Sequence, residues 1–303
     1  MEPFFESGLE WIMALQQVHG PVIDTFFRGI TFMGEEMFYL LFIPFLVWSV
    51  DLALGVRVGV AFLLSAYLNP VLKDIFQEPR PFHIDATVQL SEAEGTGMPS
   101  GHSQTSVMVW GVLAWQVGKK WFWAVAIAFM LLIGFSRAFL GVHFPHQVLA
   151  GWSVGIIILA AYVLLEPRAE RWLAGLRLRE QLAMAFFTPI LLALLFLSDS
   201  TVAAMAVMAG FGCGLALTLR YVPFSAAGSW WQRLLRYLVG AAVMLGIYLG
   251  LSALFPDTDG GLYYLLRFIR YGLVGLWISL GAPWLFVQLH LGQTAVSRPQ
   301  LKN

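Results

Sequence analysis

The sequence predicts an all-α integral membrane protein: a bundle of about nine transmembrane helices, preceded by interfacial helices at the N-terminus. Composition is the first observation, since 59% of the 303 residues are hydrophobic and only 12% are charged. Soluble domains carry about twice that charged fraction. The mean hydropathy of +0.74 is the second observation. The third is that the apolar residues form runs long enough to cross a bilayer as helices.

The expected elements follow in chain order. Residues 1–36 hold short amphipathic segments, which we expect to lie in the membrane interface. The side chains expected on the lipid side of the first segment are Phe4, Phe5, Leu9, Trp11, Ile12 and Leu15. The expected spans are the apolar runs at 37–50, 56–72, 103–118, 121–136, 146–165, 182–198, 202–219, 237–255 and 262–289. The charged stretch 166–180 divides a five-span core (37–165) from a four-span unit (166–303) in this interpretation.

Basic residues predict the orientation of the chain. Twelve of the 18 Lys and Arg residues fall on one side of the predicted topology. These are Arg57, Lys119, Lys120, Arg168, Arg171, Arg177, Arg179, Arg220, Arg233, Arg236, Arg298 and Lys302. The other side has Arg28, Lys73, Arg80, Arg137, Arg267 and Arg270. Because cytoplasmic loops carry the excess of basic residues, we expect the N-terminus outside and the C-terminus in the cytoplasm.

Charge balance and cysteine content exclude several classes of function. The charges of eighteen basic and eighteen acidic residues cancel, so we expect no nucleic acid as a partner. The partner that the hydropathy implies is the lipid bilayer. The single cysteine, Cys213, allows neither a disulfide within the chain nor a cysteine-based metal site. Clustered carboxylates are also missing from the sequence. We therefore expect no metal and no cofactor.

Three short stretches concentrate polar residues beside predicted spans: KDIFQEPRP (73–81), PSGH (99–102) and SRAFLGVH (136–143). All three fall on the outer side of the predicted topology. Lys73, Arg80 and Arg137 are cations that can surround the oxygens of a phosphoryl group, the two arginines through bidentate hydrogen bonds. The sequence therefore predicts an anion site at the outer membrane surface.

The remaining groups of these stretches suit phosphoryl transfer. PSGH precedes the span that begins near Ser103, so the backbone N–H groups of Ser100, Gly101 and His102 are expected to point at an anion from a helix N-terminus. His102 and His143 are the two histidines of the stretches. One imidazole can attack phosphorus while the other protonates the leaving alkoxide.

The pattern K-x6-RP, PSGH and SR-x5-H resembles the signature of the type 2 phosphatidic acid phosphatase superfamily, which includes the glucose-6-phosphatases and the vanadium haloperoxidases. This resemblance implies metal-independent, vanadate-sensitive hydrolysis of a phosphate monoester through a phosphohistidine. It implies a nucleophile at His143 and a general acid and base at His102. The phosphate ligands that it implies are Lys73, Arg80, Ser100, Gly101 and Arg137.

One position departs from the family pattern. The family usually has an aspartate four residues after the nucleophile, where this sequence has Gln147 in HFPHQ. An amide oxygen can still accept a hydrogen bond from the imidazole, but it stabilises a cationic ring less than a carboxylate does.

HFPHQ resembles the corresponding stretch of the glucose-6-phosphatases, which implies a nine-span enzyme of this branch. The short loop between the first two motifs and the tail without a di-lysine ending favour a bacterial homologue in the inner membrane.

The sequence leaves the substrate open. The glucose-6-phosphatase resemblance favours a sugar phosphate. A lipid phosphate, such as phosphatidic acid or an isoprenyl diphosphate, is the alternative. A third hypothesis, of another class, is a protein that binds or transports an anion without hydrolysing it.

Overall fold

The computed structural model describes residues 3–256 and 259–294, so the predicted roles of Arg298 and Lys302 lie outside the described residues, as does the side chain of Phe4. The regular structure of the described chain consists of helices and one antiparallel pair of two-residue strands. The fold class predicted from the sequence, an all-α polytopic membrane bundle, is confirmed.

The first half of the chain holds α1 (Pro3–Gln16), α2 (Pro21–Phe32), α3 (Glu36–Phe45), η1 (Leu46–Val50), α4 (Leu52–Phe76), α5 (Pro81–Ile84), η2 (Ala86–Val88), α6 (Gly101–Val117), α7 (Lys120–Phe139) and α8 (Pro145–Gly175). The second half holds α9 (Leu178–Leu195), α10 (Asp199–Tyr221), β1 (Phe224–Ser225), α11 (Trp230–Leu254), α12 (Gly260–Leu276), η3 (Trp277–Gly281), α13 (Ala282–Gln288) and β2 (Gln293–Thr294).

The expected count of nine spans is not confirmed. Within the described ranges, seven helices are long and apolar enough to cross a membrane. An eighth span is possible if α2 and α3–η1, which meet at a bend of 54°, are counted together. Helix α6, which covers the predicted run 103–118, has 17 residues and begins with the polar sequence GHSQTS. It is buried from Ser103 to Ala114, so its side chains face other helices and need not be apolar.

The helices belong to two compact units, which we describe one at a time. Residues 1–40 and 64–167 form the first unit, and residues 41–63 and 168–303 form the second. The division predicted from the sequence, into 1–36, 37–165 and 166–303, stays a prediction. The compact units have other bounds, since residues 41–63 belong to the second unit.

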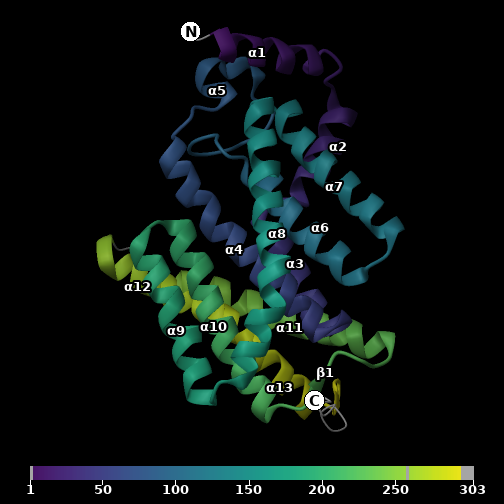
Figure 1. Cartoon of the computed structure of the whole chain (residues 1–303), viewed down its shortest axis with the longest axis vertical. Coiled ribbons are helices and arrows are strands. Elements are labelled where there is room, and N and C mark those ends of the chain that lie inside the picture. The colour runs from purple at the N-terminus through teal and green to yellow at the C-terminus, as the bar shows by residue number, and fades with distance from the viewer. Residues whose placement is uncertain (1–2, 257–258, 295–303) are drawn as a thin grey trace. The chain divides into compact units, whose positions relative to one another are not determined.

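In the first unit, α6 is the central helix, and α4, α7 and α8 surround it (Figure 1). Hydroxyl groups join α4 to α6, since Ser65 Oγ and Thr105 Oγ1 lie 3.0 Å apart. Small residues let α8 approach α6: a Cβ added at Gly155 would meet the Cβ of Val107 at 2.8 Å. Close approach at small residues is how helices in membranes gain packing contacts.

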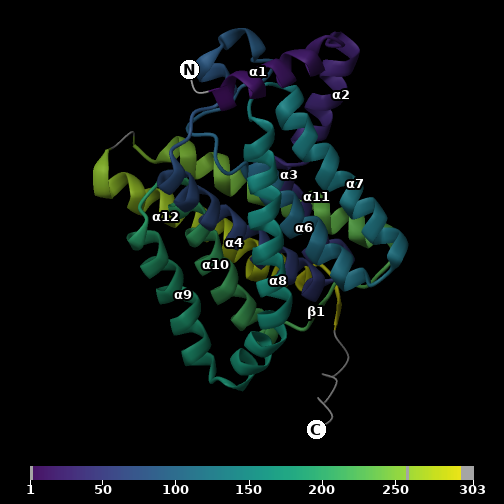
Figure 2. The ribbon, with the colours of Figure 1, turned by 45° about the horizontal axis from the view of Figure 1, so that its top comes forward.

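Helix α1 packs on protein, contrary to the expectation that Leu9 and Ile12 face lipid. Leu9 and Ile12 are buried against Val88 and Phe144. The helix contacts α5, η2 and α7, and Figure 2 shows it crossing the end of α7. An amphipathic helix buries its apolar face on whichever apolar surface is closest, and here the loops after α5 and α7 supply that surface.

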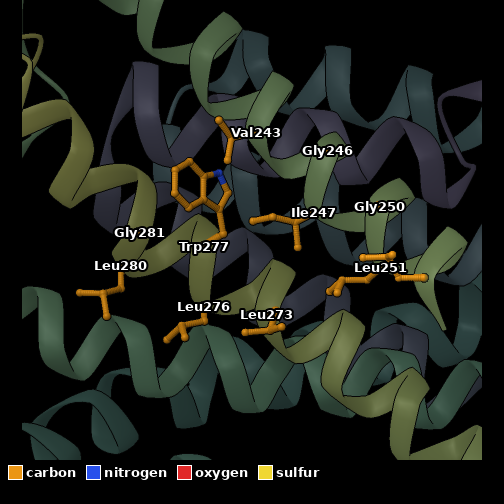
Figure 3. A pocket seen from close by; sticks show the side chains of 11 residues that line it. Val243, Gly246, Ile247, Gly250, Leu251, Leu273, Leu276, Trp277, Leu280 and Gly281 are labelled. Atoms are coloured by element: carbon orange, nitrogen blue, oxygen red, sulfur yellow. The ribbon is translucent and has the colours of Figure 1, made fainter.

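In the second unit, α10 lies between α9 and α12 (Figure 1). An apolar groove of about 680 Å³ opens between α11 and the α12–η3 segment (Figure 3). Its lining residues are Val243, Gly246, Ile247, Gly250, Leu251, Leu254, Leu273, Leu276, Trp277, Leu280 and Gly281. Among residues 3–256 and 259–294, all the side chains that line this groove are apolar.

Candidate active site

The three polar stretches meet at one end of the first unit. Different elements supply their side chains: Lys73 lies in the last turn of α4, Arg80 directly precedes α5, and Arg137 lies in the last turn of α7. Ser100 caps the N-terminus of α6, and His143 lies in the connection between α7 and α8. Hydrogen bonds link the segments that carry these side chains.

His143 is buried, with 1% of its surface exposed, and both ring nitrogens have partners. Nε2 lies 3.1 Å from Nη1 of Arg80. Because a guanidinium can only donate, Nε2 accepts this hydrogen bond and carries a lone pair. The proton is therefore on Nδ1, which donates to Oε1 of Gln147 over 3.2 Å. This tautomer leaves the ring's lone pair on Nε2.

Gln147 is fully buried, and its neighbours fix the orientation of its amide. Oε1 also accepts a hydrogen bond from the N–H of Phe144 (3.1 Å). Nε2 donates to the carbonyl oxygen of Pro79 (2.8 Å) and to Oε1 of Glu78 (2.7 Å). Gln147 thus accepts the imidazole N–H, as the sequence predicted. The participation of Glu78 was not predicted.

Backbone carbonyl groups hold Arg80 in place. Its Nε donates to the carbonyl oxygen of Gly95, Nη2 to that of Glu94 and Nη1 to that of Val142, over 2.7–2.9 Å. The side chain is 4% exposed. Fixed in this way, the guanidinium aims its remaining Nη1 hydrogen at His143 Nε2.

Two buried nitrogen atoms of the site have no partner among residues 3–256 and 259–294: Nε of Arg137 and Nε2 of His102. Nη1 of Arg137 does donate to Oγ1 of Thr31 (2.6 Å). Buried polar groups are nearly always hydrogen-bonded, so two unpaired ones together point to a ligand. The positive charge of Arg137 favours an anion as that ligand.

The N-terminus of α6 differs in one respect from the expectation. The N–H of Ser100 donates to the carbonyl oxygen of Gln147 (3.0 Å), so the expectation that it points at an anion is wrong. The N–H groups of Gly101 and His102 are in the first turn and have no acceptor within their own helix. A Cβ at Gly101 would meet Oδ1 of Asn69 at 2.8 Å, so only glycine fits there without a shift.

The turn between α2 and α3 completes the site and was missed by the sequence analysis. Thr31 accepts the hydrogen bond from Arg137, and the charge of Glu35 acts on the same guanidinium. Gly34 lies against the imidazole of His102. We expected this region to lie in the membrane interface. No motif marks it, and in the sequence Thr31 is only one of several polar residues in the segment 21–33.

The electrostatic environment keeps His143 neutral. Burial, followed by the charges of Arg80, Arg137 and Lys73, lowers the pKa of His143 well below its usual value of 6.5. The charge of His102, close enough to interact, acts in the same direction. A neutral imidazole keeps its Nε2 lone pair, which is the form that a nucleophile requires.

Comparisons with known proteins agree with this site. A sequence model of the PAP2 superfamily matches residues 54–171, which include every predicted site residue from Lys73 to Gln147. A second model, described as a PAP2 superfamily phosphatase transmembrane extension, matches residues 202–294.

Several named proteins are similar over part of the chain. Lipid phosphate phosphatase delta of Arabidopsis thaliana is 26% identical over 206 residues, which cover 63% of this chain and 49% of that protein. Glucose-6-phosphatase 3 of Bos taurus is 28% identical over 183 residues, which cover 52% of this chain and 53% of that protein. Undecaprenyl-diphosphatase of Sulfolobus acidocaldarius is 32% identical over 104 residues, which cover 34% of this chain and 50% of that protein. The chain thus spans about half the length of these relatives.

The contact between Gly34 and His102 yields a prediction. In Gly34→Ala the new Cβ would meet Cδ2 of His102 at 2.7 Å and Cγ2 of Ile133 at 3.0 Å, so the imidazole must shift. We expect the affinity for inorganic phosphate, measured by calorimetry in detergent, to fall about tenfold or more, since displacements of about 1 Å are costly in such sites. Gly29→Ala is the control, because a Cβ at Gly29 meets nothing within 4 Å. Equal affinities of the two variants would contradict this role of Gly34.

Proposed function

This chain belongs to the PAP2 superfamily of phosphatases, and from that premise we propose that it hydrolyses phosphate monoesters through a phosphohistidine on His143. One observation carries the proposal. The unprotonated Nε2 of His143 lies beside Arg80, and Arg137 Nε and His102 Nε2 are buried with no hydrogen-bond partner in the described part of the chain.

The first step transfers the phosphoryl group to the protein. An incoming phosphate oxygen replaces His143 Nε2 as the acceptor of the Arg80 hydrogen bond, which frees the Nε2 lone pair. Nε2 then attacks phosphorus, the P–Nε2 bond forms and the bond from phosphorus to the ester oxygen breaks. The leaving oxygen takes a proton from His102, whose protonated form a bound phosphate dianion stabilises. Arg137 donates to the equatorial oxygens as their charge changes.

The second step returns the protein to its starting state. His102, now neutral, takes a proton from a water molecule, and the water oxygen attacks phosphorus. The P–Nε2 bond breaks, and inorganic phosphate leaves. His143 regains its neutral form, with the Nδ1 proton still bonded to Gln147.

A sugar phosphate is the substrate class that the sequence favours. HFPHQ at 143–147 resembles the glucose-6-phosphatases, and glucose-6-phosphatase 3 is among the relatives. A lipid phosphate is a second candidate, because Ile75 and Phe76, just after Lys73 in α4, are 67% and 50% exposed. Exposed apolar side chains beside a phosphate ligand suit a substrate with a hydrocarbon tail.

The proposed site faces the non-cytoplasmic side of a bacterial inner membrane. The excess of basic residues on the other side of the predicted topology supports this orientation. Within the second unit, Arg57 pairs with Glu170 (2.8 Å) and Nη1 of Arg233 donates to the carbonyl oxygen of Ser49 (3.1 Å). These contacts bring together connections that the topology assigns to the cytoplasm.

The roles of the two histidines can be separated with p-nitrophenyl phosphate, whose leaving group needs no protonation. His102→Ala should still form the phosphohistidine but fail to activate water. We expect a burst of about one equivalent of p-nitrophenolate, followed by turnover slowed about 10²- to 10⁴-fold. His143→Ala should give no burst. Full turnover by His143→Ala, or no turnover by the native protein on any phosphate ester, would contradict the proposal.

The lowered pKa of His143 predicts the pH dependence. Because the pKa is lowered, the neutral nucleophile persists as the pH falls below 6.5 and is lost only when the pH passes through the lowered pKa. Lys73→Met removes one of the cations that lower the pKa of His143. The acid-side decline of the burst rate, measured as a function of pH, should therefore move to higher pH. The substrate ionises identically with both proteins, so the difference between the two profiles reports on the protein. An acid limb that does not move would contradict the assignment.

The substrate class can be tested by initial rates in detergent. If the sugar phosphate proposal holds, kcat/KM for glucose 6-phosphate exceeds that for phosphatidic acid in mixed micelles. Ile75→Ser with Phe76→Ser should then leave glucose 6-phosphate hydrolysis unchanged. Hydrolysis of phosphatidic acid alone, weakened by these two substitutions, would reject the sugar phosphate and support the lipid.

A further inference from the structure

We propose that Glu78 is a positioning residue that stabilises the cationic ring of His143 through the amide of Gln147. The inference rests on the proposed function, because it concerns the charge that develops on the nucleophile. A carboxylate usually contacts the nucleophilic histidine directly in this family, and here a neutral amide takes its place.

A continuous chain of hydrogen bonds connects Glu78 to the nucleophile. His143 Nδ1 donates to Gln147 Oε1 over 3.2 Å, and Gln147 Nε2 donates to Glu78 Oε1 over 2.7 Å. The amide cannot reverse, since a flip would face its NH₂ group to the Phe144 N–H and its oxygen to the Pro79 carbonyl. Both amide hydrogens and both oxygen lone pairs are used. Gln147 therefore transmits the field of Glu78 in one direction only.

The charge of Glu78 matters most when the P–Nε2 bond forms. The imidazole then becomes cationic while keeping its Nδ1 proton, so no proton has to move along the chain. Hydrogen bonds in series polarise one another. The carboxylate draws positive charge to the Gln147 NH₂ group, makes Oε1 a stronger acceptor, and so favours the cationic ring.

Local structure holds the carboxylate in position. The side chain of Glu78 is 19% exposed, and its Oε1 also pairs with Nε2 of His146. The backbone carbonyl of Glu78 accepts a hydrogen bond from the N–H of Gly97 (2.7 Å). A Cβ at Gly97 would meet Cδ of Gln147 at 2.7 Å, so glycine leaves room for the amide. The pairing with His146 raises a competing explanation, in which Glu78 only anchors the first turn of α8.

A double-mutant cycle separates the two explanations. Gln147→Asp places a carboxylate directly beside His143 and removes the amide through which Glu78 acts. We expect Glu78→Gln to lower kcat about tenfold in the native background with KM changed less than about twofold, as for other groups that orient a functional side chain. In the Gln147→Asp background, Glu78→Gln should leave kcat unchanged or raise it, because it removes a like charge beside Asp. Glu92→Gln, which neutralises an exposed carboxylate of the neighbouring loop, is the matched control and should match the native protein.

Vanadate affinity provides a readout that needs no turnover. Vanadate adopts the five-coordinate geometry of phosphoryl transfer, so its binding should weaken about tenfold in Glu78→Gln while phosphate binding changes little. If the native protein hydrolyses no ester, the proposed function fails, but the vanadate cycle still tests Glu78. Equal losses in both backgrounds would show that Glu78 is only an anchor. No loss in the native background would overturn the inference.

Discussion

Positive charge buried around two imidazoles is the constraint on which the first unit depends. A buried cation is tolerated only where hydrogen-bond acceptors surround it. Arg80 meets this requirement with the carbonyl oxygens of Glu94, Gly95 and Val142. Arg137 meets it only in part, because its Nε has no acceptor in the described part of the chain. The fold therefore holds the guanidinium of Arg80 through all three of its nitrogen atoms and leaves Nε of Arg137 without an acceptor among the described residues. An anion removes this deficit, so binding a phosphoryl group also stabilises the pocket.

The polar interior of α6 extends this constraint into the helix bundle. Gln104 donates to Oγ of Ser65 (3.1 Å) and accepts a hydrogen bond from Asn69 (3.0 Å), whose amide also donates to the carbonyl oxygen of Pro99 (3.2 Å). Side-chain hydrogen bonds between helices compensate for the weak hydrophobic drive to associate inside a membrane. This network ties α4 to the loop before α6 and so sets the positions of Gly101 and His102. Gln104 and its neighbours Ser103, Thr105 and Ser106 make α6 unlike an apolar span.

Sequence reasoning succeeded where the signal is local. Apolar runs marked the long helices, and the three motifs marked the stretches that the fold brings together. It failed where tertiary contacts decide. The amphipathic pattern of α1 showed that one face is buried, but could not show that Phe144 rather than lipid covers it. The capping position of Ser100 suggested a free N–H, yet the carbonyl oxygen of Gln147 accepts it. Thr31 and Gly34 carry no motif and join the site only through the turn between α2 and α3.

The segment Glu78–Arg80 shows why the departure at Gln147 can be compatible with catalysis. Arg80 donates to Nε2 of His143, while Pro79 and Glu78 accept both hydrogens of the Gln147 amide that holds Nδ1. Three consecutive residues thus act on both ring nitrogens, one directly and two through the amide. A shift of this segment would therefore alter the hydrogen bonds at both ring nitrogens. Replacing the usual aspartate by glutamine then moves the negative charge one residue outward instead of removing it, provided that a carboxylate at position 78 accompanies the amide at position 147.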